Sequence, residues 1–198
     1  MRYYAHRRNS LAELRSTPVG HGVELDLRDD GRRIIVAHDP FSDGPDVDSY
    51  FRELGARPCI LNLKCEGIEG AVLAAAARHG VTDFFLLDLS IPAATKLARQ
   101  GETRLAIRYS EVEPIELALA WIGRARWVWI DCFTDWPGNP EAWARLSQHF
   151  SLCVVSPELQ GHGRGAISSF ADQARGRPFH AVCTKHADDW QARLGPLP

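Results

Sequence analysis

The chain has no long apolar run, no basic surplus and only one methionine. No stretch approaches the roughly 18 consecutive apolar residues of a membrane-spanning helix, so no transmembrane segment is expected. The net charge of -2 argues against a general nucleic-acid binder, which would carry an excess of lysine and arginine. We therefore expect neither nucleic acid nor a membrane span to be part of its function.

A targeting segment and a zinc site are also not expected. The first ten residues, MRYYAHRRNS, carry charges where a signal peptide needs an apolar core. The five cysteines form no CxxC motif, their number is odd, and each lies in or beside an apolar run. Reduced, mostly buried thiols in a cytoplasmic protein fit this pattern best.

Short apolar runs alternate with helix-like stretches along all 198 residues. This alternation predicts parallel βαβ units, and eight units predict one domain over residues 1–198: a small (β/α)8 TIM barrel. An open doubly wound sheet is the alternative, although no GxGxxG follows the first strand. The expected strands are 3–6, 22–28 paired with 34–39, 59–64, 83–89, 104–110, 127–133, 151–159 and 180–185. The expected helices are 67–80, 91–101, 113–123, 139–150 and 165–176.

Polar residues gather at the ends of the expected strands, where a barrel forms its active site. For the later ones, a role in lining the site and a structural ion-pair ring are both open. His162, in a glycine-rich loop after the seventh strand, is a further lining candidate. The early residues are His6, Arg7, Glu24, Asp26, His38, Asp39, Asn62, Lys64 and Glu66, and the later ones are Asp88, Arg108, Asp131, Glu158 and Lys185.

Two carboxylates interrupt one apolar strand. Because side chains alternate along a strand, Glu24 and Asp26 share a face. Buried carboxylates repel each other unless they are paired or bind a cation, and a hard divalent cation such as Mg²⁺ or Ca²⁺ takes oxygen ligands. By the same alternation, Asn62, Lys64 and Glu66 are expected to share a face of a neighbouring strand.

In order and spacing, these residues resemble the glycerophosphodiester phosphodiesterase family, within the phosphatidylinositol-specific phospholipase C-like superfamily. Members carry His-Arg, Glu-x-Asp, His-Asp and Glu-x-Lys motifs at successive strand ends. The corresponding motifs here are His6-Arg7, Glu24-Leu25-Asp26, His38-Asp39 and Asn62-Leu63-Lys64. The resemblance implies a (β/α)8 barrel that cleaves a phosphodiester.

The resemblance also implies roles for single residues. It implies His6 and His38 as the acid/base pair, Arg7 and Lys64 as phosphate contacts, and Glu24 and Asp26 as metal ligands. The chain departs from the family pattern at Arg8, where members carry glycine, and in NSLAEL, which replaces a Pro-Glu-Asn-Thr stretch. Asn62 replaces the third acidic ligand, with Glu66 as an alternative. Only 19 residues separate Asp39 from Cys59, so no insertion subdomain is expected.

The resulting expectation is a divergent, compact phosphoric diester hydrolase, or a cyclising lyase. It would act on a glycerophosphodiester-like or sugar-phosphodiester small molecule, with Mg²⁺ or Ca²⁺. One alternative is an aldolase-like enzyme that forms a Schiff base on Lys64 or Lys185. Another is a barrel that binds phosphate or sugar phosphate without catalysis. Trp136 is expected either to pack in the core or to stack on a sugar. The oligomeric state does not follow from the sequence.

Overall fold

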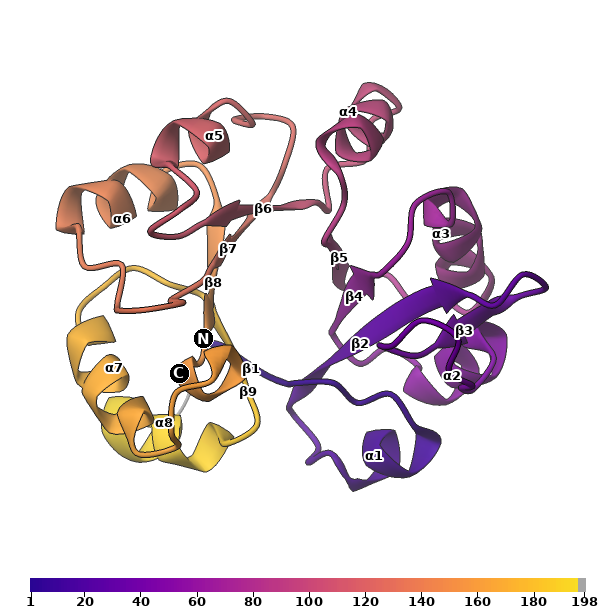
Figure 1. The fold of residues 1–198 in the computed structure, drawn as a ribbon, viewed down its shortest axis with the longest axis horizontal. Helices are drawn as coiled ribbons and strands as arrows, with labels where there is room; N and C mark the ends of the chain where they lie inside the picture. Colours follow the sequence, from indigo (N-terminus) through magenta and orange to yellow (C-terminus); the bar gives the residue numbers. More distant parts are fainter. Residues whose placement is uncertain (196–198) are drawn as a thin grey trace. The chain divides into compact units, whose positions relative to one another are not determined.

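A computed structural model describes residues 1–195 and contains two compact units. The amino-terminal unit comprises residues 5–102, and the carboxyl-terminal unit comprises residues 1–4 together with residues from 103 onward. Each unit contains strands that alternate with helices (Figure 1).

In the amino-terminal unit, β2 pairs in parallel with β4, and β4 pairs in parallel with β5. The short strand β3 returns antiparallel to β2, so the segments expected at 22–28 and 34–39 form a hairpin. The register places Asp26 opposite Asn62, which brings the carboxylate strand beside the Asn-Leu-Lys strand. The elements are α1 (Leu11–Ser16), β2 (Gly22–Asp29), β3 (Ile34–Val36), α2 (Val47–Leu54), β4 (Cys59–Leu63), α3 (Glu69–Arg78), β5 (Phe84–Leu87) and α4 (Ile91–Arg99).

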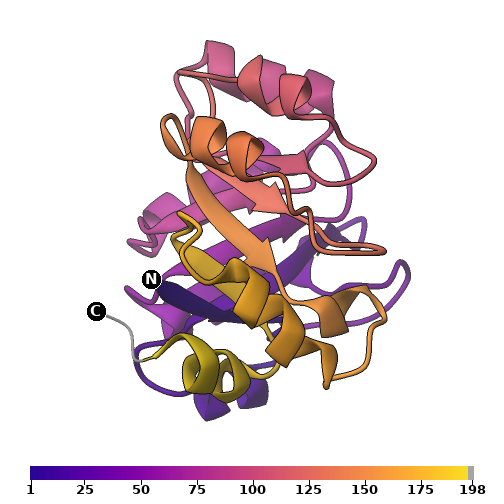
Figure 2. The ribbon, with the colours of Figure 1, turned by 90° about the vertical axis from the view of Figure 1, so that its left-hand side faces the viewer.

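In the carboxyl-terminal unit, the strand order is β1-β9-β8-β7-β6, and β6 to β9 are parallel. Its helices lie in front of the strands in Figure 2. Because helices cover the sheet, its strands are apolar almost throughout. The elements are β1 (Arg2–Ala5), β6 (Ala106–Tyr109), α5 (Ile115–Leu119), β7 (Trp127–Ile130), α6 (Pro140–Ser147), β8 (Ser151–Val155), the 3₁₀ helix η1 (Pro157–Gln160), α7 (Ala166–Ala174), β9 (Ala181–Thr184) and α8 (Ala187–Leu194).

The predicted (β/α)8 order is confirmed, because each of the eight expected strand units is followed by a helix. Between β3 and β4 the structure contains only α2, as expected for a barrel without an insertion subdomain. Four cysteines are buried and Cys65 is partly exposed, which agrees with mostly buried thiols. Within residues 1–195, no helix combines the length and apolarity needed to cross a membrane.

Some element boundaries were predicted wrongly. The strand expected at 151–159 ends at Val155, because Pro157 begins η1 and contributes no N–H to a ladder. Helices α1, α2 and α8 were not predicted. The helix α1 has six residues, too few to show a periodic pattern, yet Ser10 and Glu13 form a capping box at its start. The N-cap of α6 is Asn139, whose side chain accepts from the N–H groups of Glu141 and Ala142.

Candidate active site

The first strand delivers its polar residues through a strained turn. Strand β1 ends at Ala5, and Arg7 adopts a left-handed backbone conformation with φ of 51°. Such a conformation costs a non-glycine residue about 1–3 kcal/mol. Two backbone hydrogen bonds to Glu24 hold the turn: the Arg7 N–H donates to the carboxylate at 2.6 Å, and the Arg8 N–H donates to the main-chain carbonyl at 2.8 Å. The turn therefore positions His6 and Arg7 beside the second strand.

The carboxylates of Glu24 and Asp26 are both buried, with 1% of each residue exposed. Glu24 Oε1 accepts a hydrogen bond from Asn62 Nδ2 at 2.9 Å, and Oε2 lies 3.7 Å from His6 Nε2. Burial raises the pKa of Glu24 to about 7, and the neighbouring Asp26 charge adds to the rise. The hydrogen bonds from Asn62 and the Arg7 N–H act in the opposite direction. This carboxylate pair carries a repulsive cost that a cation would offset.

Asp26 is held by Asn9, a residue that the sequence interpretation did not identify. Asn9 Nδ2 donates to Asp26 Oδ2 at 2.8 Å, and the Asp26 N–H donates to Asn9 Oδ1 at 3.0 Å. The two residues are 17 positions apart, so no local pattern connects them. The only hint in the sequence is that Asn9 belongs to NSLAEL, the stretch that departs from the family pattern.

Two cations lie next to Asp26. Lys64 Nζ is 3.5 Å from Asp26 Oδ1 and 2.7 Å from Asp88 Oδ2, and the Lys64 side chain is 17% exposed. Arg7 Nε is 3.7 Å from Asp26 Oδ2. Asp88 follows β5 with φ of 61°, so it also adopts a left-handed backbone conformation. Partly exposed cations at this distance suit an anion that reaches the carboxylate pair from solvent.

His38 lies in the turn after β3. Its Nδ1 lies 2.8 Å from Asp39 Oδ1, and its main-chain carbonyl accepts a hydrogen bond from Arg28 Nε at 2.8 Å. The contact with His38 lowers the pKa of Asp39. An ionised Asp39 favours the tautomer that carries the proton on Nδ1, which leaves Nε2 as the acceptor. Within residues 1–195, no hydrogen bond or ion pair joins His38 to Glu24 or Asp26.

The carboxylate pair offers oxygen atoms, which are the ligand type that a hard cation takes. Asn62 Oδ1 is buried and accepts no hydrogen bond from any residue that the structure describes. Among residues 1–195, no group of three or more His, Cys, Asp and Glu side chains is placed to hold a metal. The Asn62 amide oxygen is a neutral oxygen donor of the type that Mg²⁺ and Ca²⁺ accept.

Glu66 does not lie where strand alternation would put it. Strand β4 ends at Leu63, and Glu66 is exposed in the turn that follows. Glu66 therefore does not share a strand face with Asn62 as expected, because side chains alternate only while the backbone stays extended. Its role as an alternative ligand stays a prediction.

In the carboxyl-terminal unit, Asp131 is the centre of a buried polar cluster. It accepts hydrogen bonds from Arg108 Nη1, from Trp129 Nε1 at 3.2 Å and from Gln160 Nε2. Burial raises the pKa of Asp131 to about 6, although the Arg108 charge opposes the rise. The sequence interpretation named Arg108 and Asp131 but missed Gln160. Since Asp131 accepts from three donors, the cluster is as consistent with a structural ion-pair ring as with a binding site.

Glu158 forms a second cluster in the same unit. Its carboxylate accepts hydrogen bonds from Ser156 Oγ, from Thr184 Oγ1 at 2.7 Å and from the Lys185 N–H at 3.0 Å. The carboxylate thus connects the ends of β8 and β9. The side chain of Lys185 is exposed. A lining role for Glu158 and Lys185 stays a prediction.

Trp136 and His162 are held by aromatic neighbours in the carboxyl-terminal unit. Trp136 stacks on Trp143 with ring centroids 5.1 Å apart, and it meets the edge of Phe170 at 5.8 Å. Because Trp136 is 6% exposed, its packing role explains it better than stacking on a sugar. His162 Nε2 lies 3.1 Å from the Phe133 carbonyl oxygen, and its lining role stays a prediction.

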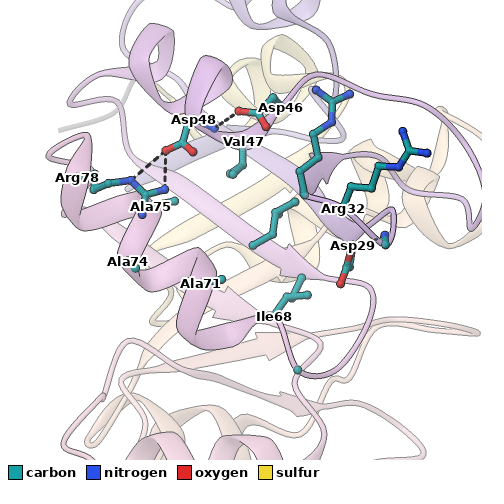
Figure 3. Close-up of a pocket in the computed structure, with 14 residues that line it drawn as sticks. Asp29, Arg32, Asp46, Val47, Asp48, Ile68, Ala71, Ala74, Ala75 and Arg78 are labelled. Atoms are coloured by element: carbon teal, nitrogen blue, oxygen red, sulfur yellow. Dashed lines mark hydrogen bonds and ion pairs between the residues drawn. The ribbon is translucent and has the colours of Figure 1, made fainter.

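A pocket of about 530 Å³ lies elsewhere in the amino-terminal unit, and no residue of the carboxylate cluster lines it (Figure 3). Small apolar side chains of α3 form much of its wall, and Ile68 lies at one end. Among its charged groups, Asp48 pairs with Arg78 at 2.7 Å, and Asp46 caps α2. The chemistry of the candidate site is therefore not in this pocket.

Comparison with solved structures shows the fold. A crystal structure assigned to a glycerophosphoryl diester phosphodiesterase of Agrobacterium tumefaciens strain C58 has a TM-score of 0.73 at 14% sequence identity, covering 97% of this chain and 96% of its own. A glycerophosphodiester phosphodiesterase from the same organism has a TM-score of 0.68 at 16% identity, covering 99% and 100% of the two chains. No protein-family model and no curated protein matches the sequence. The resemblance expected from the motifs is thus confirmed in the fold over nearly the whole chain.

Proposed function

We propose that this chain hydrolyses a phosphodiester bond in a small molecule. Its fold is shared with the two glycerophosphodiester phosphodiesterase structures. The observation that carries the proposal is the buried Glu24–Asp26 pair, with His6, Arg7 and Lys64 all within 3.7 Å of it. A general acid/base, two cations and two paired carboxylates in one place can together support cation-assisted cleavage of a phosphodiester.

Glu24, Asp26 and the Asn62 carbonyl oxygen would hold Mg²⁺ or Ca²⁺, with Glu66 as an alternative to Asn62. The buried Asn62 Oδ1 without a hydrogen-bond partner among residues 1–195 supports this assignment. When bound, such a cation polarises a phosphoryl oxygen and lowers the pKa of a bound hydroxyl or water. A cation would also offset the repulsion between the two carboxylates.

His6 and His38 would move the protons. One takes the proton of the attacking hydroxyl, and the other protonates the leaving alkoxide, since imidazole titrates near neutral pH. Asp39 supports this role for His38 because it accepts from Nδ1 and leaves Nε2 for transfer. Hydrolysis and intramolecular cyclisation share these steps and differ only in whether water or a substrate hydroxyl attacks.

Arg7 and Lys64 would bind the phosphoryl oxygens. The two side chains are partly exposed, Arg7 at 44% and Lys64 at 17%. Their nitrogen atoms lie 3.7 Å and 3.5 Å from the Asp26 carboxylate, which is longer than a hydrogen bond. A phosphate oxygen would offer each cation a shorter, charge-assisted contact than Asp26 does. The Schiff-base alternative fits Lys64 less well, because two carboxylates occupy the approach to Nζ that a carbonyl substrate would need.

A barrel that binds phosphate without catalysis is the second candidate, and Asn62 favours it. Members of the resembled family carry an acidic ligand at this position, and an amide supplies no charge to the cation. Such a protein would bind a phosphorylated ligand through Arg7 and Lys64 and release it unchanged.

Turnover of an alkyl phosphodiester tests the proposal. Wild type, His6→Ala and Glu24→Ala are compared with glycerophosphodiesters as substrates, with Mg²⁺ or Ca²⁺ and with EDTA, by release of the phosphomonoester or cyclic product. The expected result is cation-dependent turnover that falls by about 10²–10⁴-fold in both variants. If wild type bound the ligand without turnover, the result would contradict the enzyme proposal and favour the non-catalytic binding protein.

A further inference from the structure

The segment that carries Asn9 is rigidly held. Ser10 caps α1 and forms a capping box with Glu13, in which the Glu13 carboxylate accepts from the Ser10 N–H at 2.9 Å. On the other side of Asn9, the Arg8 carbonyl accepts a hydrogen bond from the Tyr50 hydroxyl. Because both neighbours are fixed, the Asn9 side chain leaves the backbone from a defined position.

The Asn9 amide is attached to Asp26 at two points. Its nitrogen donates to the Asp26 carboxylate at 2.8 Å, and its oxygen accepts from the Asp26 N–H at 3.0 Å. Two hydrogen bonds between one planar amide and one residue fix both the backbone and the side-chain torsion of Asp26. A single bond to the carboxylate alone would leave that torsion free to turn.

The other polar contacts of the Asp26 carboxylate are longer and come from charged groups. Arg7 lies 3.7 Å from Oδ2 and Lys64 lies 3.5 Å from Oδ1. Under the proposed function these two cations turn to the substrate phosphate during the reaction. Among residues 1–195, Asn9 is then the neutral group that keeps Asp26 in place when its cationic neighbours leave.

We propose that Asn9 is a positioning residue, whose amide holds Asp26 Oδ2 so that Oδ1 is the oxygen presented to the divalent cation. This inference rests on the proposed cation site and deepens it. Groups that orient a metal-binding side chain without touching the metal typically contribute 10–100-fold to metal affinity, and Asn9 has the geometry of such a group.

Metal affinity of the full chain, measured by titration calorimetry with Mg²⁺ alone and Ca²⁺ alone, tests this role. Asn9→Ala is compared with wild type and with Asn139→Ala, in which the same substitution removes the N-cap of α6 in the other unit. The expected result is roughly 10–100-fold weaker cation binding in Asn9→Ala and unchanged binding in Asn139→Ala. Thermal unfolding in EDTA shows how much each substitution destabilises the cation-free protein.

The outcomes separate this inference from the proposed function. Cation binding by Asn9→Ala within twofold of wild type would overturn the positioning role. Equal weakening in Asn9→Ala and Asn139→Ala would also overturn it, since the loss would then come from general destabilisation. If Asn9→Ala shows no cooperative unfolding, Asn9→Ser replaces it, because a serine hydroxyl is too short to make both contacts. A wild type that binds neither cation refutes the proposed cation site itself.

Discussion

Asn62 donates its amide to Glu24 at 2.9 Å, while its buried carbonyl oxygen accepts no hydrogen bond within residues 1–195. A buried acceptor without a donor costs about 1–3 kcal/mol, and a bound cation would satisfy it. The contact between Asn62 and Glu24 therefore has both a structural role and a proposed functional role. Asn62 lowers the cost of burying Glu24, and it would also supply the third oxygen ligand.

Asn62→Glu is expected to strengthen cation binding by roughly tenfold or more, because affinity for a hard cation rises with the number of charged ligands. Without the cation the same variant should be less stable than wild type, since a third carboxylate joins the buried pair. Titration calorimetry measures the first effect, and urea unfolding in EDTA measures the second. Weaker cation binding in Asn62→Glu than in Asn62→Ala would show that this position is not a ligand.

Saturating Mg²⁺ or Ca²⁺ is expected to stabilise the protein, because a ligand that binds only the folded state adds to its stability. At about a hundred times the dissociation constant the gain is about 2.7 kcal/mol, or roughly 5–10 °C in Tm for a chain of this size. Thermal unfolding with the cation and with EDTA measures it. The gain should be absent in Glu24→Ala and retained in Asp188→Asn, which changes an exposed carboxylate on α8. An equal gain in Glu24→Ala would show that the cation binds at another site.

Asp131 should contribute a stability change between about pH 4 and pH 6. Its pKa is raised by burial to about 6, so the folded state binds a proton more readily than the unfolded state. The contribution of Asp131 to the free energy of unfolding is fully present below the pKa of the unfolded chain. It falls by about 2–3 kcal/mol as the pH rises through 6. Asp131→Asn should remove this decline.

Urea unfolding of wild type and Asp131→Asn at pH 4.5 and pH 7.5 measures the difference. Asparagine keeps one acceptor oxygen for Trp129 or Gln160, so the cluster keeps part of its hydrogen bonding. The variant should lose less stability than wild type between the two pH values. An equal loss in both proteins would mean that Asp131 titrates in the folded state as it does in the unfolded chain.

The two histidines should respond differently to the leaving group. A nitrophenolate leaves without protonation, whereas an alkoxide needs a proton from the general acid. Loss of the acid histidine should therefore reduce turnover of an alkyl diester much more than that of a nitrophenyl diester, by roughly 10²-fold or more. Loss of the base should reduce both equally. His6→Ala and His38→Ala assayed with both substrates identify the acid, and indistinguishable losses in both variants on both substrates would contradict a division of roles.

Sequence patterns predicted the eight strand units well, because a buried parallel strand appears in the sequence as a continuous apolar run. Such a run can be recognised without knowing which strand it pairs with. They also predicted that Glu24 and Asp26 share a face, which the backbone period alone requires. The same rule failed for Glu66, since β4 ends at Leu63 and alternation ends with it. The helices α1 and α2 were missed, although each begins at a side-chain cap, Ser10 and Asp46.

The sequence by itself determined which chemical groups occur and which strand end carries each of them. The tertiary structure decided which groups touch. The contacts of Asn9 with Asp26 and of Asn62 with Glu24 join residues 17 and 38 positions apart, and they depend on strand register and on the turn at Arg7. Long-range contacts of this kind follow from the packing of the whole sheet, because no local periodicity encodes the distance between two side chains on different strands.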